Sequence, residues 1–250
     1  MKNWIQIALA ALLPFTIAAT AKADAAKDLA EAVAAAQTAD IRSEAERARD
    51  ANRKPAETLA FFRFRQDMRV LELVPGGGWY TKILAPLLYE DGELFVSLYA
   101  DRLQESLFSK PGFDRISVIE TQGDMARVGR QIEGLSFEAE DMDLVLTFRN
   151  LHNFTAAGRA ALNASAFAAL KPGGYYGVVD HTRRHMQEDN YENWRRLDPV
   201  LAIQEIEAAG FDFVDYSDLH YRLDDELRYE VGRRSVSGNT DRFTLLFQKP

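Results

Sequence analysis

Residues 69–84 read RVLELVPGGGWYTKIL, and this stretch decides the fold. It begins with a short apolar run, Val70–Val74, which Pro75 ends, a pattern typical of a buried parallel strand. The glycines at 76–78 then give a turn without Cβ atoms, which a ligand can approach closely. A helix is expected from Trp79, and its free N-terminal amides would face whatever lies over the turn. A strand, a glycine turn and a helix in this order are typical of the nucleotide-binding opening of an open α/β sheet.

Beyond this opening the chain alternates between expected strands and helices. Residues 122–141 are expected to form only a short helix and a loop, and Pro199 is expected to kink or break its helix. The alternation, followed by a terminal pair of strands, predicts an α/β fold with a doubly wound, mostly parallel sheet. The expected strands are 70–74, 93–99, 115–120, 142–148, 175–180, 211–216 and 242–248, and the expected helices are 79–89, 102–109, 155–170 and 191–209.

The first residues have the pattern of a secretory signal peptide, residues 1–23. Lys2 supplies a positive start, Trp4–Ala19 an apolar region, and Ala21–Ala23 a small-x-small cleavage site. The apolar run is shorter than the ~20 residues that a membrane span needs, so no stable membrane insertion is expected after cleavage. The sequence therefore predicts an exported, periplasmic protein.

Composition and charge limit the kinds of partner that this protein can bind. The 250 residues are 47% hydrophobic, which suffices for one large core. Loss of Lys2 and Lys22 with the signal peptide leaves 28 basic against 38 acidic residues and a net charge of −10. Such a chain is a poor partner for nucleic acids and for anionic membranes. The absence of cysteine excludes disulfides, thiolate metal sites and cysteine nucleophiles.

The mature chain is expected to consist of a helical leader, residues 24–54, and one domain, residues 55–250. The leader is rich in Ala, Glu and Arg, and its early part is compatible with a frayed helix. The densely charged segment Ser43–Asp50 is expected to be a solvated helix face with i,i+4 ion pairs. Pro55 is expected to begin a short helix before the first strand.

Three nucleotide-binding patterns compete at the glycine turn. A phosphate-binding P-loop requires a Lys-Ser or Lys-Thr pair, which does not follow these glycines. A dinucleotide fingerprint would place Thr81 where a third glycine lets helix and strand pack, which is a weak match. Glu72, an acid within the strand, favours a third possibility.

The chain resembles the class I S-adenosylmethionine-dependent methyltransferases, whose first motif runs acid-x-Gly-x-Gly-x-Gly. That motif stands here as Glu72–Gly78, with Val74 in place of the first glycine. LKPGG at 170–174 and MDLVLTFRNLH at 142–152 are two further landmarks, in the family's order. The resemblance covers roughly residues 55–250. It implies the Rossmann-like methyltransferase fold, a seven-stranded, mostly parallel sheet with an antiparallel terminal strand, here preceded by the helical leader.

A closer resemblance is to a group of exported bacterial proteins known as predicted methyltransferases, for which no substrate is established. This resemblance indicates the fold more clearly than it indicates the reaction. The segments that carry it are RARD (47–50), RKP (53–55), PGGGWYT (75–81), LTFRNLHN (146–153) and TDRF (240–243).

The resemblance implies S-adenosylmethionine as cofactor and a small molecule as methyl acceptor. Asp124 resembles the acid that accepts the adenine amino hydrogens. Asp101 is the nearest acid for the ribose, or alternatively the N-cap of the following helix. The cofactor-binding residues that the resemblance implies are Glu72, Gly76, Gly77, Gly78, Asp101 and Asp124.

Methyl transfer from a sulfonium is an in-line displacement that depends on placing the nucleophile, and a nucleophile of high pKa also needs a base. Candidate residues leave the expected fourth and fifth strands, although His152 is also compatible with an ordinary loop histidine. His181 and His185 have a metal-ligand spacing without a third ligand, so no metal site is predicted. The candidate catalytic residues are His181, His152 and Asp180, and the candidate substrate-binding residues, for an anionic substrate, are Arg149, Asn150 and Arg183.

Three functions are compatible with these patterns. The first is S-adenosylmethionine-dependent methyl transfer to a small molecule. The second is a periplasmic ligand-binding protein on the same scaffold with altered or lost catalysis, which Val74, Leu98 and the signal peptide favour. The third is a nicotinamide oxidoreductase, through Gly76-x-Gly78 alone. Neither the acceptor atom nor the oligomeric state follows from the sequence.

Overall fold

The computed structural model describes residues 13–250, and their side chains from residue 25 onward. Residues 1–12 of the expected signal peptide lie outside the described part of the chain, and helix α1, Leu13–Thr38, spans the remainder. The signal peptide stays a prediction. From residue 13 on, none of the helices combines the length and the hydropathy that a membrane-spanning segment requires.

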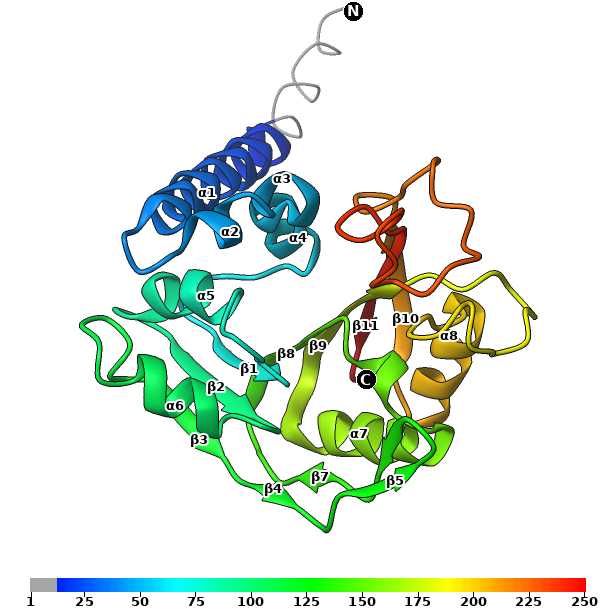
Figure 1. Ribbon diagram of the computed structural model, residues 1–250. Helices are drawn as coiled ribbons and strands as arrows, with labels where there is room; N and C mark the ends of the chain where they lie inside the picture. The colour runs from blue at the N-terminus through cyan, green and yellow to red at the C-terminus, as the bar shows by residue number, and fades with distance from the viewer. Residues whose placement is uncertain (1–12) are drawn as a thin grey trace, which may run out of the picture.

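A central sheet organises the molecule and confirms the predicted fold (Figure 1). Its seven strands lie in the order β10-β11-β9-β8-β1-β2-β3. All neighbours from β9 to β3 pair in parallel, whereas β11 is antiparallel to both β9 and β10. The strands are β1 (Arg69–Leu73), β2 (Glu93–Ser97), β3 (Ser117–Ile119), β8 (Met142–Phe148), β9 (Leu170–His181), β10 (Asp212–Ser217) and β11 (Arg242–Gln248).

Helices cover both faces of the sheet, mostly where the sequence predicts them. Thr155 caps α7 as expected, because its hydroxyl accepts a hydrogen bond from the Gly158 amide. The helix expected over 191–209 was placed too early: Pro199 is its first residue, capped by Asp198. The helices are α2 (Glu44–Arg47), α3 (Asp50–Arg53), α4 (Pro55–Phe61), α5 (Thr81–Leu88), α6 (Asp101–Leu107), the 3₁₀ turn η1 (Leu151–Asn153), α7 (Ala156–Ala169) and α8 (Pro199–Ala208).

The segment 122–141, expected as a short helix and a loop, is instead two small antiparallel ribbons. Strand β4 (Thr121–Gln122) pairs with β7 (Ser136–Phe137), and β5 (Ala126–Val128) pairs with β6 (Gln131–Glu133). These strands have two or three residues each, too few for their side chains to reveal an alternating pattern in the sequence.

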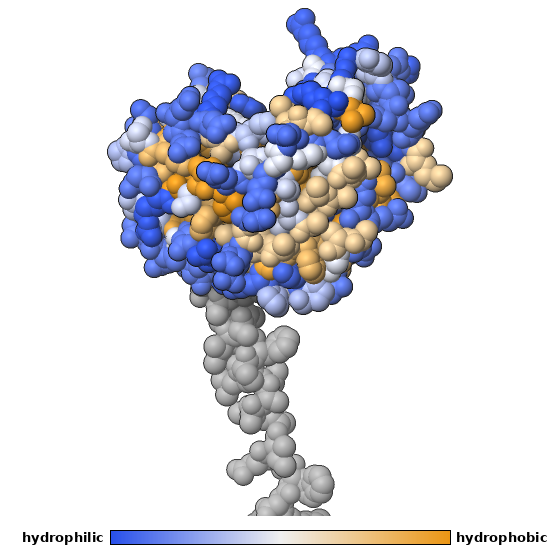
Figure 2. Space-filling model, turned by 90° about the horizontal axis from the view of Figure 1, so that it is seen from below, coloured by the Kyte–Doolittle hydropathy of each residue, from blue (hydrophilic) through white to orange (hydrophobic). Residues whose placement is uncertain are grey.

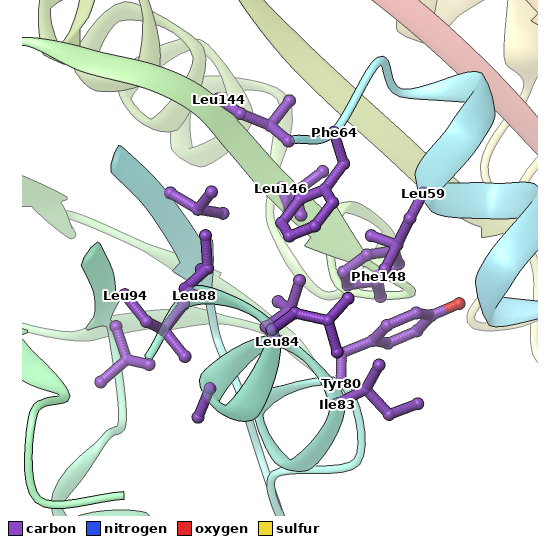
Figure 3. Close-up of a cluster of buried hydrophobic side chains, with 14 of the residues drawn as sticks. Leu59, Phe64, Tyr80, Ile83, Leu84, Leu88, Leu94, Leu144, Leu146 and Phe148 are labelled. Atoms are coloured by element: carbon purple, nitrogen blue, oxygen red, sulfur yellow. The ribbon is translucent and has the colours of Figure 1, made fainter. Parts of the chain in front are cut away.

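Two hydrophobic clusters lie on the two faces of the sheet. In β8, Leu144 and Leu146 belong to one cluster and Val145 to the other, because successive side chains of a strand point to opposite faces. Figure 3 shows the first cluster, in which Tyr80 lies against Phe148 with ring centroids 3.5 Å apart. Burial of each such side chain contributes about 1.5–3 kcal/mol, so this packing holds the end of β8 against the start of α5.

The leader is packed on the domain, contrary to the expectation of a solvated, frayed helix. Leu29 and Val33 of α1 are buried in the first cluster. Arg42 and Glu46 are also buried: Arg42 pairs with Asp50, and Glu46 pairs with Lys82 of α5 at 2.9 Å. The ion pairs of this segment therefore bind elements to one another instead of running along one exposed helix.

The segment 218–241 lies against the leader, and both stand at the top of Figure 1. The Asn52 side chain donates a hydrogen bond to the Gly238 carbonyl at 2.8 Å. His220 bridges the Arg53 carbonyl and the Thr244 hydroxyl through its two ring nitrogens. The leader and the segment 218–241, which are far apart in the sequence, thus contact each other. Figure 2 shows the face seen from below, where apolar areas are interrupted by hydrophilic ones.

Candidate functional site

The glycine turn follows β1, and Val74, Gly76 and Gly78 in it have positive φ. Val74, in place of the motif's first glycine, has φ +52°, a conformation that costs a β-branched residue roughly 1–2 kcal/mol. A Cβ atom at Gly76 or Gly77 would meet nothing within 4 Å. A Cβ atom at Gly78 would lie 2.5 Å from Leu103 of α6. Gly78, which was expected to make room for the cofactor, therefore allows close packing of α6.

Glu72 ties the strand to the helix after the turn. It is 3% exposed, and it accepts a hydrogen bond from the Thr81 hydroxyl at 2.6 Å. Burial raises the pKa of the Glu72 carboxyl to about 8, despite the opposing effects of Thr81 and Arg53. Glu72 is therefore mostly protonated at neutral pH in this structure.

A cavity of about 190 Å³ lies over the turn. Asn150 helps to close it by donating hydrogen bonds to the Leu73 and Val74 carbonyls, so it connects the end of β8 to the turn. Asn150 was predicted to bind substrate, and its contacts make it a residue that positions the turn. The cavity is lined by Glu46, Arg49, Arg53, Glu72, Val74, Pro75, Gly76, Gly77, Trp79, Tyr80, Phe148, Arg149 and Asn150.

Asp101 and Asp124, the predicted ribose and adenine partners, do not line this cavity. Asp101 is the exposed first residue of α6, and the N-cap is Ala100, which has no capping side chain. Asp124 is exposed between β4 and β5. The structure therefore brings together Glu72 and the glycines but not the two aspartates.

A buried histidine–aspartate pair joins the ends of β8 and β9. His152 Nδ1 lies 2.5 Å from Asp180 Oδ1, and the His152 backbone amide donates to Asp180 Oδ2 at 2.9 Å. Both side chains are buried. The aspartate fixes the ring and leaves Nε2 as the free ring nitrogen, which is the arrangement of a general base.

His181 lies beside this pair, with the two imidazole centroids 5.5 Å apart. Its Nδ1 lies 2.8 Å from the Thr240 hydroxyl. Burial, together with the neighbouring His152 and arginines, holds the pKa of His181 well below its usual range, so this imidazole is neutral at pH 7. His181 is thus available as a neutral hydrogen-bonding partner next to His152.

His185, by contrast, is exposed and bonds Asp198 at 2.9 Å. The segment that carries it is not helical, so the spacing from His181 does not bring the two side chains onto one helix face. Within residues 13–250, no group of three or more His, Asp or Glu side chains is arranged to hold a metal ion.

A second cavity, of about 420 Å³, adjoins the first and shares Arg49, Arg53 and Arg149 with it. His152 and His181 line this second cavity, which therefore lies next to the cavity over the glycine turn. Arg183, predicted to bind substrate, is elsewhere: its guanidinium pairs with Asp189 at 3.2 Å. The lining residues are Arg49, Asn52, Arg53, Arg149, His152, Asn153, His181, Arg195, Val231, Gly232, Ser237, Gly238, Thr240 and Arg242.

Trp79 anchors the leader arginines at the junction of the two cavities. The Arg53 guanidinium carbon lies 4.3 Å from the centroid of the Trp79 ring, and that of Arg42 lies 4.8 Å from it. The Trp79 indole also donates to the Glu46 carbonyl at 2.9 Å. Cation–π contacts thus hold Arg53 in place without neutralising it.

Sequence reasoning missed three of the arginines at the site, Arg49, Arg53 and Arg242. Arg49 and Arg53 belong to the leader, and Arg242 begins β11. A signal was present, because the segments RARD, RKP and TDRF carry the resemblance to the exported group. The sequence did not indicate that the two ends of the chain meet.

Solved structures similar to this chain share its fold at low identity. One is an S-adenosylmethionine-dependent methyltransferase from Aquifex aeolicus, with 13% identity, a TM-score of 0.55, and coverage of 78% of this chain and 89% of that one. Another is the glycopeptide N-methyltransferase MtfA complexed with sinefungin, with 14% identity, a TM-score of 0.53, and coverage of 80% and 87%. At these identities the likeness establishes the fold.

A third similar structure has a different activity. It is the [4+2]-cyclase SpnF, with 16% identity, a TM-score of 0.52, and coverage of 80% of each chain. No protein-family model matches the sequence, and no curated protein matches it. The reaction must therefore be argued from the site itself.

Proposed function

We propose that this protein transfers a methyl group from S-adenosylmethionine to a small molecule. The observation that carries the proposal is the adjacency of two cavities that share three arginines: one over the glycine turn of a methyltransferase-like sheet, the other lined by His152, which Asp180 holds. Donor and acceptor would meet where the cavities share Arg53 and Arg149.

The residues over the turn fit the cofactor. Gly76 and Gly77 leave open space above the backbone, as a bound nucleoside requires. Glu72, whose pKa is about 8, can ionise toward the cofactor's ammonium group. Structural neighbours add support, since MtfA binds sinefungin, an analogue of S-adenosylmethionine.

S-adenosylmethionine supplies an electrophilic methyl group when bound. The chain's own contribution is to orient the acceptor and remove its proton. His152 Nε2 would take the proton from a hydroxyl, while Asp180 holds the ring and stabilises the resulting imidazolium. Neutral His181 would orient the acceptor by a hydrogen bond, and the leader with segment 218–241 would limit the access of water.

Calorimetry on the chain without residues 1–23 tests the proposal. We expect S-adenosylmethionine and its demethylated product to bind, and NAD not to bind. Gly77→Leu, which fills the open space over the turn, should weaken the binding by at least about tenfold, which corresponds to about 1.4 kcal/mol. Absence of binding of both sulfur nucleosides at millimolar concentration would refute the proposal.

The base is tested by His152→Gln, assayed with an acceptor found by screening. We expect turnover to fall by about 10²–10⁴-fold, the usual contribution of a positioned base, with donor affinity unchanged. His185→Gln is the matched control, because His185 is exposed and lies outside both cavities. Equal rates for His152→Gln and the unaltered protein would remove His152 from the mechanism.

A ligand-binding protein without methyl transfer is the second candidate. The strained Val74 favours it, since a substitution within the turn motif is compatible with altered donor binding. The cyclase among the similar structures is an example of other chemistry on this fold. Donor binding without methylation of any screened acceptor would favour this candidate.

We also propose that the protein is exported, on the basis of residues 1–23. This location requires a supply of the donor outside the cytosol. A fusion of the full chain to a reporter that is active only in the periplasm should give signal, and deletion of residues 2–19 should abolish it. Signal from the deleted form would refute export through this segment.

A further inference from the structure

Four arginines line the joined cavities without a carboxylate partner. Arg53 and Arg242 are 4% and 6% exposed, Arg149 is half-buried, and Arg49 is exposed. In the part of the chain that the structure describes, none of the four forms an ion pair. Buried charges in proteins are normally paired, so an unpaired group of one sign at a cavity indicates a ligand of the other sign.

The hydrogen bonds of these arginines leave donors free. Arg242 donates to the Asn52 carbonyl at 3.0 Å, but its buried Nε has no partner. The Arg53 guanidinium carbon lies 4.3 Å from the centroid of the Trp79 ring, and among the described residues its N–H groups make no hydrogen bond. For Arg149 no side-chain hydrogen bond exists among the described residues. A guanidinium with free donors is suited to carboxylate and phosphate oxygens.

Mutual repulsion among these arginines also indicates an anionic ligand. Burial, and then the charges of Arg149, Arg49 and Arg242, lower the pKa of Arg53 to about 9. Burial and the charge of Arg149 lower the pKa of Arg242 to about 10. An anion placed among the arginines would offset this mutual repulsion.

The cofactor carries one carboxylate, so it can neutralise at most one of the four arginines. S-adenosylmethionine carries a sulfonium, an ammonium and a single carboxylate, so its net charge is positive. The carboxylates over the turn do not neutralise the others, because Glu46 pairs with Lys82 and Glu72 is largely protonated. The second cavity has no carboxylate in its lining. Asp180 lies behind this lining and is already engaged by His152 and by the His181 amide. The further negative charge that the arginines can meet therefore comes from the acceptor.

We propose that the acceptor is a small molecule with at least two negative charges on carboxylate or phosphate groups, bound in the second cavity by Arg53, Arg149 and Arg242. Its acceptor atom, a hydroxyl oxygen, would face His152 Nε2. The methyl group would form a bond to that oxygen as its bond to the donor's sulfonium breaks, the electron pair stays on the sulfur of the departing thioether product, and the hydroxyl proton passes to His152 Nε2. This inference rests on the proposed function insofar as the anion is the methyl acceptor. The volume of about 420 Å³ suits a small, polar molecule.

The test is calorimetric titration of the mature chain with citrate and, separately, pyrophosphate, with sodium chloride at equal ionic strength as reference. We expect one of the two polyanions to bind. Binding of citrate would indicate recognition of carboxylates, and binding of pyrophosphate would indicate recognition of phosphates. Arg149→Met should weaken that binding by at least about tenfold. Arg242→Met, tested in parallel, covers the case in which the first variant does not fold.

Arg65→Met is the matched control, since Arg65 is exposed, pairs with Asp67, and lies outside both cavities. It should leave the affinity for the polyanion unchanged. A second readout separates binding from structure: Arg149→Met should raise the midpoint of thermal unfolding of the ligand-free protein, because it removes an unpaired charge. A lower midpoint with unchanged polyanion affinity would assign Arg149 a structural role and overturn the proposal.

Titration with the demethylated cofactor on the same samples keeps the two proposals apart. If the cofactor binds and neither polyanion binds more tightly than chloride, the anionic acceptor is refuted and the proposed reaction stands. If a polyanion binds and no sulfur nucleoside does, the anion site stands and methyl transfer is refuted.

Discussion

Arginines that are buried or half-buried occur in this protein in two groups that differ in their partners. In the first group each guanidinium meets a carboxylate: Arg42 with Asp50, Arg159 with Glu205, and Arg196 with Asp225. In the second group, Arg53, Arg149 and Arg242, no such pair forms among the described residues. The first group joins elements of the fold, for example α7 to α8 through Arg159 and Glu205. The second group surrounds a cavity.

The difference between the two groups shows how buried charges are stabilised in this fold. A pair satisfies both partners and secures the architecture, although it adds little net stability compared with an apolar pair. Glu72 illustrates another solution, because the carboxyl stays protonated and hydrogen-bonded to Thr81. Among the described residues, the arginines at the cavity have neither solution, which is why we assign them to a ligand.

The largest expected effect concerns the paired group. Arg196 forms two hydrogen bonds with Asp225, at 2.8 and 2.9 Å, and both side chains are buried. Arg196→Met would leave Asp225 charged and buried, so we expect the free energy of unfolding to fall by about 3–5 kcal/mol in urea titrations. Arg149→Met should cause no such fall. Equal losses in the two variants would break the distinction between paired and unpaired arginines.

The next effect concerns Glu72 and depends on pH. Its pKa in the folded protein, about 8, exceeds the reference value of 4.5, so the stability it contributes is fully present below pH 4.5 and is lost as pH rises through about 8. Glu72→Gln should therefore match the unaltered protein at pH 5 and exceed it by about 2–4 kcal/mol at pH 9, since one pKa unit corresponds to about 1.4 kcal/mol.

Unfolding by urea at several pH values measures this difference. Glu93→Gln is the matched control, because Glu93 is half exposed and pairs with Arg69 at the surface. Its difference from the unaltered protein should stay constant between pH 6 and 9. A constant difference for Glu72→Gln as well would show that Glu72 is ionised in the folded protein.

The smallest expected effect concerns the positive φ of Val74 in the glycine turn. It tests whether this backbone conformation is strained, as the unpaired arginines are by their mutual repulsion. Val74→Gly should change the free energy of unfolding by less than about 1 kcal/mol, because relief of the positive φ offsets the lost side-chain packing. Val145→Gly, in the fully buried β8, should lose at least about 3 kcal/mol. Similar losses at both positions, measured in urea, would show that Val74 is not strained.

Continuous apolar runs made much of the fold predictable. Strands β8 and β11 have the bounds that the sequence indicated, because both are buried over almost their whole length and most of their side chains are apolar. The ribbons between β4 and β7 were missed because they are too short to show a period. The start of α8 was missed because a proline fits the first turn of a helix as well as it breaks one.

The site was predictable only where it follows strand ends. Glu72, His152 and Asp180 come directly from the order of the strands, because parallel strands bring their carboxyl ends to one edge. Arg53 and Arg242 lie 189 positions apart in the sequence, and their meeting depends on contacts such as that between Arg242 and the Asn52 carbonyl. No local pattern of helix or strand contains that information.

The position of β11 in the sheet has a consequence for biosynthesis. It lies between β9 and β10, although it follows both along the chain. A ribosome-bound chain therefore cannot close the sheet, or bring Arg242 to Arg53, until residues 242–248 have left the exit tunnel. Until then β9 presents an unpaired edge, on which chaperones can act and other chains can aggregate. The site is thus completed only when β11 enters the sheet between two strands that precede it along the chain.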